Sequence, residues 1–213
     1  MITPPKLYMK RTDVPIESLF DMAEDQSIET QAGINRNGEA LIDLDFRSTK
    51  LRKDIQPAGY PDVAYILEQM VGIWQKDLDP KMFVAKEFNY LRYGPGDLFG
   101  KHKDLIPVKD KDGKVRVFSS STIIKQSDDL EGGDFIIYDH YDTPHTVPLK
   151  PGETIFFSSN VHHEVTKVTK GNREVLVAWI YERSDKDIKL KNEIQKLREY
   201  ERQFRHPKDL GMV

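Results

Sequence analysis

Four side chains near the middle of the chain have the types that a metal site beside an anionic ligand requires. His102 and Asp104 stand two residues apart, so on an extended segment they point to the same side. A second imidazole must come from a distant segment, and Arg173 adds a guanidinium that can bind a carboxylate with two parallel donors. Two imidazoles and one carboxylate leave three positions of Fe(II) open. This set predicts a mononuclear iron site with a cationic anchor for an acidic cosubstrate.

The second imidazole is expected from the adjacent pair His162 and His163. In the strand predicted here, alternation places His163 on the inward face with its apolar neighbours and His162 on the face that meets water. His163 is therefore the preferred ligand and His162 the alternative. A competing interpretation makes His163 a core histidine that donates to a backbone carbonyl. The remaining candidates fall in predicted loops or in the polar tail: His140, His145 and His206.

Arg173 begins a strongly apolar stretch, residues 175–181. Charged side chains are seldom buried without a partner, and the sequence fixes no acidic partner for this one. A bound dicarboxylate would satisfy the guanidinium. The alternative is an arginine at a strand end that reaches solvent.

Taken in order, these motifs resemble the Fe(II)/2-oxoglutarate-dependent dioxygenases, and among them the prolyl 4-hydroxylase-like branch. Arg47-Ser48 also resembles an upstream element of that branch. Ile124-Lys125 departs from it, because the family usually has Tyr-Leu there. The resemblance covers about residues 88–181, and its blocks are residues 91–96, 102–104, 129–135, 156–165 and 171–173.

The resemblance implies a role for each matching residue. It makes His102, Asp104 and His163 the iron ligands, and Arg173 the group that binds the C5 carboxylate of 2-oxoglutarate. It places Tyr93, and after it Tyr90, in the wall of the cosubstrate pocket. The implied cofactors are Fe(2+), 2-oxoglutarate and O2, with ascorbate as an additional one. The implied activity is hydroxylation of an unactivated C–H bond, first of all in a prolyl residue of a peptide or protein.

The expected fold is mainly β with flanking helices, a double-stranded β-helix or jelly roll with helices packed on one sheet. Residues 1–80 are expected to supply an arm, a strand at residues 40–46 and packing helices, including a helix from Pro61 to Trp74 with one apolar stripe. Short strands with frequent turns predict the catalytic core at residues 81–184. Residues 185–213 are expected to form an amphipathic helix, and a dimer through residues 185–204 is the weaker interpretation. The charged stretch 107–117 is a candidate substrate loop.

Composition limits the partners. The 213 residues carry a formal charge of −3, which argues against a nucleic-acid substrate, and no apolar run is long enough to span a membrane. Without cysteine, any metal must be held by histidine or carboxylate. A cytoplasmic location is expected. Besides a prolyl peptide, a free amino acid or another small molecule stays open as the substrate. The non-enzymatic alternative is a metal-free jelly roll that only binds a partner.

Overall fold

The computed structural model describes residues 7–12, 14, 16–19, 30–36, 39–104, 116–183, 189 and 196. The chain separates into two units, Met1–Glu182 and Arg183–Val213. The first unit contains nearly all of the described residues. In the second, Lys189 and Lys196 are helical and exposed, and the rest of the helix predicted at 185–213 lies outside the described residues. No helix in the described part of the chain is long and apolar enough to cross a membrane.

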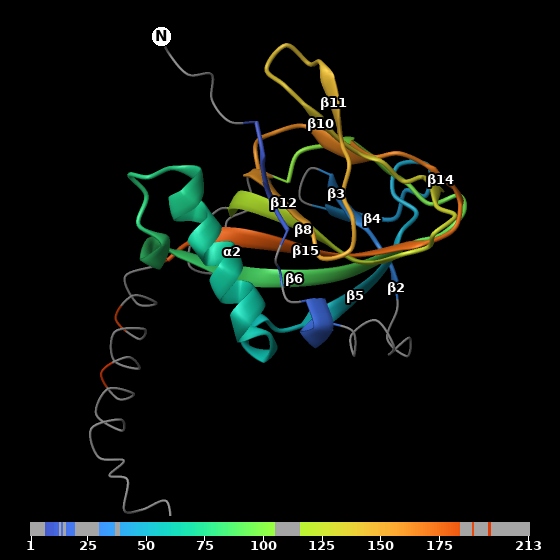
Figure 1. Ribbon diagram of the computed structural model, residues 1–213. Coiled ribbons are helices and arrows are strands. Elements are labelled where there is room, and N and C mark those ends of the chain that lie inside the picture. The colour runs from blue at the N-terminus through green and yellow to red at the C-terminus, as the bar shows by residue number, and fades with distance from the viewer. Residues whose placement is uncertain are drawn as a thin grey trace, which may run out of the picture. The chain divides into compact units, whose positions relative to one another are not determined.

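Two antiparallel sheets face each other in the first unit (Figure 1), as the predicted jelly roll requires. The larger sheet has the strand order β1-β12-β8-β15-β6-β5-β2, and the smaller one β11-β10-β13-β7. The remaining strands of the described residues form two short ladders, β14-β9 and β3-β4. In chain order the strands are β1 Met9–Arg11, β2 Thr30–Gln31, β3 Ile34–Arg36, β4 Glu39–Leu41, β5 Lys50–Ile55, β6 Phe83–Tyr93, β7 Phe99–His102, β8 Arg116–Gln126, β9 Glu131–Gly132, β10 Phe135–Tyr138, β11 Pro144–Val147, β12 Thr154–Ser158, β13 His163–Val165, β14 Val168–Lys170 and β15 Arg173–Glu182.

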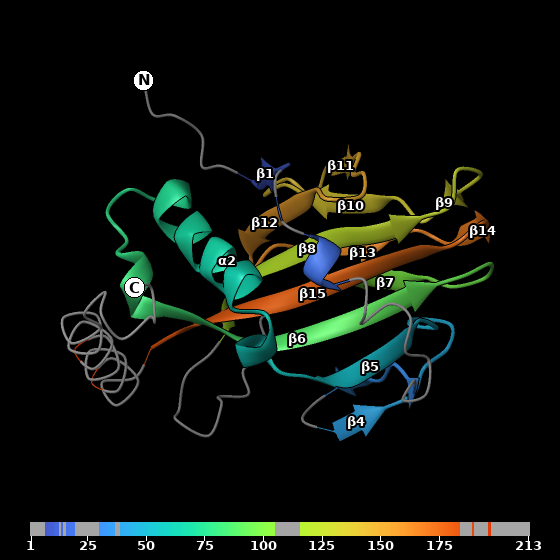
Figure 2. The same ribbon diagram turned by 60° about the horizontal axis from the view of Figure 1, so that its bottom comes forward.

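Helix α2, Pro61–Trp74, covers the outer face of the larger sheet (Figures 1 and 2). Its start has the expected signals, because Pro61 lies in the first turn with Asp62 beside it. The predicted apolar stripe is confirmed, since Val63, Leu67 and Met70 are fully buried. Among the described residues of the first unit, the other helical segments are three short 3₁₀ turns, Ile16–Leu19, Pro57–Gly59 and Pro80–Met82.

The larger sheet therefore has two cores, one on each face. Helix α2 and the strands beneath it enclose the first, which includes Phe88, Tyr90 and Leu176. The second lies between the two sheets. A central strand such as β15 is buried on both faces, which explains its almost continuous apolar sequence.

The strand predicted at residues 40–46 is wrong over most of its length. Strand β4 ends at Leu41, and residues 44–46 form a turn. Ile42 is 66% and Leu44 56% exposed, so the alternation of apolar and polar residues there does not mark a buried face. The single strand predicted around His162 and His163, residues 161–168, is divided into β13 and β14. Strands β1 and β5 were not predicted, and both join the larger sheet.

Candidate metal centre

Neighbouring strands of the smaller sheet bring the two imidazoles together. Strand β7 ends with His102 and β13 begins with His163, and these two residues are directly paired across the ladder. Their ring centroids lie 4.2 Å apart. Asp104 follows β7 by two residues, and one ligand atom from each of the three residues lies within 4.8 Å of the others. The Nε2 atoms of His102 and His163 face the two carboxylate oxygens of Asp104, at 3.6 and 3.5 Å.

Backbone carbonyls hold both imidazoles in the tautomer that a metal ligand needs. The Nδ1 atom of His102 lies 2.7 Å from the carbonyl oxygen of Gly100, and that of His163 lies 3.0 Å from the carbonyl oxygen of Val161. A carbonyl only accepts, so each Nδ1 carries the proton and each Nε2 keeps its lone pair. The two free lone pairs point to the side where the carboxylate lies.

Burial sets the charge states at this site. His163 is 5% exposed, and burial, with His102 beside it, lowers its pKa to about 4, so that the imidazole is neutral at pH 7. Burial alone would raise the pKa of Asp104, but His163, His102 and a hydrogen bond from Ser119 together hold it below its usual range. Neutral imidazoles and an ionised carboxylate are the states in which these groups bind a divalent cation.

The Arg173 guanidinium is buried close to this triad and lacks most of its partners. Only 4% of the residue is exposed. Its Nη1 donates to the carbonyl oxygen of Gly133, while Nε and Nη2 have no hydrogen-bond partner among the described residues. Burial lowers the pKa of this group, and the smaller opposing effects of Tyr93 and Asp134 do not offset it. Two unmatched donors on one buried guanidinium form a ready site for the two oxygens of a carboxylate.

Of the two predicted tyrosines, the structure brings only Tyr93 to the site. Tyr93 pairs with Arg173 across β6 and β15, and its ring centroid is 5.6 Å from the guanidinium carbon. Tyr90 lies in the other core, under helix α2, where its hydroxyl accepts from Nε of Arg92 at 3.1 Å. Residues three apart on a strand face opposite sides, so the sequence already contained the signal that separates them.

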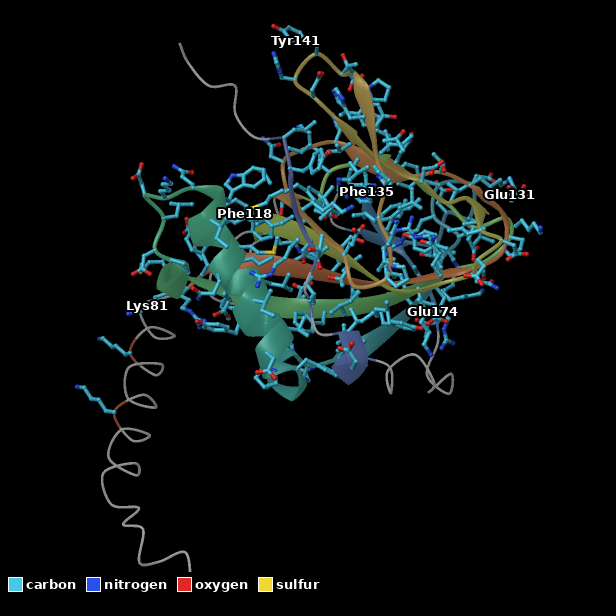
Figure 3. All side chains as sticks on the ribbon, in the orientation of Figure 1. Lys81, Phe118, Glu131, Phe135, Tyr141 and Glu174 are labelled. Atoms are coloured by element: carbon cyan, nitrogen blue, oxygen red, sulfur yellow. The ribbon has the colours of Figure 1, made fainter. Side chains whose placement is uncertain are left out.

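The other histidines lie away from the triad. His162 is exposed, as alternation predicted. His145 pairs with Asp139 at 3.1 Å. The rings of His140 and Tyr141 are in tilted contact at the tip of the β10–β11 hairpin, where Figure 3 shows Tyr141 projecting from the body. His206 and the candidate loop 107–117 lie outside the described residues, apart from Arg116 and Val117 at the end of the loop, which belong to β8.

Two spaces border the triad. A narrow one of about 30 Å³ lies between Arg173, Tyr93 and the three ligand residues. A cleft of about 520 Å³ opens on the other side of His102 and Asp104. Trp179 and Arg47 line both, so they separate the inner space from the cleft. Binding of a molecule as large as 2-oxoglutarate in the inner space requires its lining side chains to move apart.

Sequence reasoning missed the residues that shape the cleft. The Arg116 guanidinium stacks over Trp179 at 3.8 Å, and it is held by Glu87 at 2.7 Å and by the hydroxyl of Tyr181 at 2.9 Å. These residues come from three strands of the larger sheet and share no motif. Arg47, noted only through its resemblance, lies flat over Phe99 with its guanidinium carbon 4.2 Å from the ring centroid.

The fold and the triad together define a class, the 2-oxoglutarate and iron(II) oxygenases, and three comparisons agree with it. The sequence model of the 2OG-Fe(II) oxygenase superfamily matches residues 88–181. A PKHD-type hydroxylase of Shewanella sp. (strain MR-4) is 32% identical over 167 residues, 77% of this chain and 73% of the relative. The chain belongs to the PKHD-type hydroxylase family of this superfamily. Two other curated relatives match over only 44% of their length, so the chain spans about half of them.

Solved structures show the same fold at low sequence identity. A prolyl-4-hydroxylase of Pseudomonas putida aligns with a TM-score of 0.62 at 17% identity, covering 84% of this chain and 94% of that one. A prolyl hydroxylase from Trichoplax adhaerens, in complex with a peptide fragment of the hypoxia inducible factor oxygen degradation domain, aligns with a TM-score of 0.61 at 13% identity, covering 86% of each chain.

The residues present fit both groups that the family name implies. Two Nε2 lone pairs and a carboxylate suit iron(II). The unmatched donors of Arg173 suit a carboxylate of 2-oxoglutarate. Gly133 keeps this region open, because a Cβ there would lie 3.1 Å from the Arg173 side chain.

Proposed function

We propose that this protein is an Fe(II)- and 2-oxoglutarate-dependent dioxygenase that hydroxylates a prolyl residue of a peptide or protein. One observation carries the proposal: a buried guanidinium with two unmatched donors lies beside a His-Asp-His cluster whose lone pairs converge. A guanidinium buried with unpaired donors lowers the stability of the fold, so core packing does not explain its presence. A bound carboxylate would pair these donors.

Each residue has a defined task in this proposal. His102, Asp104 and His163 hold the metal, and Arg173 holds the far carboxylate of 2-oxoglutarate, with Tyr93 forming the adjacent wall. Bound iron would supply the oxidation chemistry that couples decarboxylation of 2-oxoglutarate by O2 to insertion of oxygen into a C–H bond. The chain contributes orientation and exclusion of water, since Trp179 and the Arg47–Phe99 stack separate the inner space from the open cleft.

The cleft beside His102 and Asp104 is the proposed substrate site. Its volume of about 520 Å³ suits a few residues of a peptide, and the Arg116 and Arg47 guanidinium groups on its wall can donate to peptide carbonyls. The Trichoplax relative of the same fold binds a peptide fragment. A free amino acid or another small molecule remains the second candidate, because a cleft of this size also suits such ligands.

The proposal is tested with a panel of proline-containing peptides and free L-proline. The protein is incubated with iron(II), 2-oxoglutarate and O2, with ascorbate as a reductant, and mass spectrometry measures succinate and a gain of one oxygen atom. Peptide hydroxylation that disappears in Asp104→Ala supports the proposal. If only free proline gains oxygen, the substrate is a small molecule and the peptide hypothesis is wrong. Metal binding with no succinate formed from any substrate favours the non-catalytic binding module.

The setting of the reaction is part of the same proposal. We place the protein in the cytoplasm, where 2-oxoglutarate is supplied by metabolism, and we propose neither a nucleic-acid nor a membrane partner. Size-exclusion chromatography with light scattering tests the dimer predicted through residues 185–204.

A further inference from the structure

The two imidazoles of the triad lie in different surroundings. His163 is 5% exposed, and its ring packs against Phe135 and Phe157, whose centroids are 5.6 and 4.7 Å away. The side chain of His102 is 14% exposed and borders the open cleft. The terminal torsion of a histidine has a broad range, so contacts with the ring must fix its plane in addition to the hydrogen bond at Nδ1. What packs against the His102 ring therefore decides where its Nε2 points.

The ring of Phe99 provides a flat support for His102. The two ring centroids are 3.6 Å apart and the planes differ by 19°, so the rings are stacked face to face. Residues three apart on a regular strand point to opposite sides. Strand β7 is irregular, because His102 pairs with His163 and Phe99 with Val165, an interval of three residues against two. An extra residue of this kind turns both side chains to the same side.

The guanidinium of Arg47 covers the same phenylalanine ring. Its central carbon is 4.2 Å from the Phe99 centroid. One face of the ring has no room for both groups at these distances, so the imidazole and the guanidinium lie on opposite faces. Arg47 is 8% exposed and is fixed in turn, because its Nη1 donates to the Gly33 carbonyl at 2.8 Å and its Nε to the Thr49 hydroxyl at 3.4 Å. The Phe99 ring therefore lies between a held cation and a proposed metal ligand.

A second phenylalanine closes the side of this stack. The centroid of Phe46 is 5.9 Å from that of Phe99 and 6.4 Å from that of His102, at interplanar angles of 87° and 73°. The Gly100 amide donates to the Phe46 carbonyl at 2.7 Å, and a Cβ on Gly100 would lie 2.8 Å from the Phe46 ring. Glycine therefore leaves room for the Phe46 ring beside the stack. The carbonyl of the same Gly100 accepts from Nδ1 of His102 at 2.7 Å.

We propose that Phe99 and Arg47 are positioning residues, which form a clamp that holds the plane of the His102 imidazole. In this orientation Nε2 of His102 faces the Asp104 carboxylate at 3.6 Å, on the side where the three ligands converge. The inference rests on the proposed function only in taking His102 as a metal ligand. Loss of the Arg47–Phe99 clamp should weaken metal binding although all three ligands remain present.

The charge of Arg47 gives the proposal a distinctive sign. Arg47 lines both spaces beside the triad, so its cation lies close to the proposed metal site. A guanidinium repels a divalent cation, so by charge alone its removal should tighten metal binding. The clamp predicts the opposite, because an uncharged side chain attracts the Phe99 ring less and leaves it free to tilt. The direction of the change in Kd therefore separates the two effects.

A second stacked pair of phenylalanines provides a matched control. The ring centroids of Phe118 and Phe156 are 5.1 Å apart, and the planes differ by 26°. Both residues belong to the core under helix α2, and neither lines a space beside the triad. Phe156 is 0% exposed, so Phe156→Leu removes an aromatic stack from the core without touching the proposed site.

The test measures binding of Mn(II), an air-stable substitute for Fe(II), by isothermal titration at pH 7, with the thermal midpoint of each variant. Phe99→Leu should raise the Kd about 3- to 10-fold, the range of one aromatic pair. Phe99→Tyr keeps the stack and should stay within about 2-fold of wild type. Arg47→Met should raise the Kd about 2- to 5-fold. The double variant Phe99→Leu/Arg47→Met should bind no more weakly than Phe99→Leu, since Arg47 acts through that ring.

Two further readouts separate positioning from a general loss of stability. Phe156→Leu should lower the thermal midpoint and leave the Kd for Mn(II) within about 2-fold of wild type, as expected of a distant site. The visible absorption bands of bound Co(II) report the geometry of the ligands. These bands should shift in Phe99→Leu, return in Phe99→Tyr and match wild type in Phe156→Leu.

The contrary outcomes are equally definite. Wild-type affinity in a folded Phe99→Leu, tighter Mn(II) binding in Arg47→Met, or equal weakening in Phe156→Leu would overturn the clamp and leave the metal site in place. If Phe99→Leu does not fold, Arg47→Met decides: weaker binding supports the clamp, and tighter or unchanged binding overturns it. A wild-type protein that binds no Mn(II) would lack the metal site, which removes both the clamp and the proposed function.

Discussion

His162 and His163 are neighbours in the sequence, yet one imidazole is in solvent and the other is packed beside Asp104. His163 is the first residue of β13 and His162 immediately precedes the strand, and successive side chains of an extended segment point to opposite sides. The inward ring also stacks on Phe135, at 5.6 Å between centroids, and Figure 3 shows Phe135 in the region between the two sheets. The neighbouring pair therefore allows a direct comparison of the proposed ligand, His163, with an adjacent histidine outside the site.

The first prediction uses that comparison. His163→Ala should abolish Mn(II) binding and 2-oxoglutarate turnover, because it removes one of only three ligands. His162→Ala should keep both within about 2-fold, the range expected of an exposed side chain outside the site. Isothermal titration and succinate release measure the two effects. An inactive His162→Ala beside an active His163→Ala would show that His162, and not His163, is the ligand.

The second prediction concerns the cosubstrate anchor. Arg173→Ala should raise the KM for 2-oxoglutarate about 10- to 100-fold, because it removes a charge-assisted, two-pronged contact. Mn(II) affinity should stay nearly unchanged. The KM of Arg173→Lys should lie between those of the wild type and Arg173→Ala, since lysine retains the charge but loses the two-pronged contact. Unchanged KM in Arg173→Ala would take away the role proposed for this residue.

At the scale of elements, the turn between β9 and β10 determines where the Arg173 side chain lies. Gly133 has φ +67° and accepts from Arg173 through its carbonyl. A Cβ at this position would meet Val168 at 2.9 Å and Arg173 at 3.1 Å. Gly96 also has a positive φ, +95°, but a Cβ there would meet nothing within 4 Å.

The third prediction follows from this pair of glycines. Gly96→Ala should lower stability by about 1–2 kcal/mol through backbone strain alone and leave the KM for 2-oxoglutarate unchanged. Gly133→Ala should lower stability and also raise that KM, because the new methyl group displaces the guanidinium. Thermal melts and initial rates separate the two effects. An unchanged KM in a folded Gly133→Ala would show that this turn does not position Arg173.

Some elements were predictable because a local pattern determines them. Helix α2 has a 3.6-residue apolar stripe, and β8 and β15 read as strands from their apolar residues and flanking turns. Strand β5 was not predictable, because its Lys50-Leu51-Arg52-Lys53 sequence is charged and only pairing with β6 makes it a strand. At residues 44–46 the error is the opposite: an alternating pattern predicted a strand, but no sheet face buries its apolar residues and the segment forms a turn.

The site divides in the same way. The proposed ligands and Arg173 lie in ordered motifs, so the sequence alone could nominate them, and the structure brings the three proposed ligands together. The Arg116 position depends on Glu87 and Tyr181, which are distant in sequence, and no spacing rule indicates such a contact. The Arg47–Phe99 contact likewise joins residues that are distant in sequence, through an isolated bridge between two segments.

At the scale of the whole molecule, the buried triad makes folding and protonation interdependent. In the metal-free protein the pKa of His163 is about 4, because burial opposes its charge, whereas an unfolded chain titrates near its ordinary value of 6.5. Between pH 6.5 and 4 the unfolded chain therefore binds more protons, so stability falls as the pH falls. The carboxylate of Asp104 is half protonated in the unfolded chain only at about pH 3.8, below this window.

The fourth prediction states this as a measurement. The free energy of unfolding of the metal-free protein, from urea melts, should fall by up to about 3 kcal/mol between pH 7 and pH 4.5 through His163 alone. His163→Asn should show a shallower dependence over the same range, and His162→Ala should retain most of the wild-type slope. Equal slopes in wild type and His163→Asn would contradict the assignment of a buried neutral imidazole.

The most direct test of the central claim is an anaerobic titration of the Fe(II)-loaded protein with 2-oxoglutarate, followed by visible absorption. If the triad holds iron and Arg173 anchors the cosubstrate, a weak charge-transfer band of a chelated 2-oxo acid should grow to saturation at one equivalent. The band should be absent in Asp104→Ala and should require far more 2-oxoglutarate in Arg173→Ala. A wild-type protein that binds iron yet gives no band at saturating 2-oxoglutarate would contradict the account.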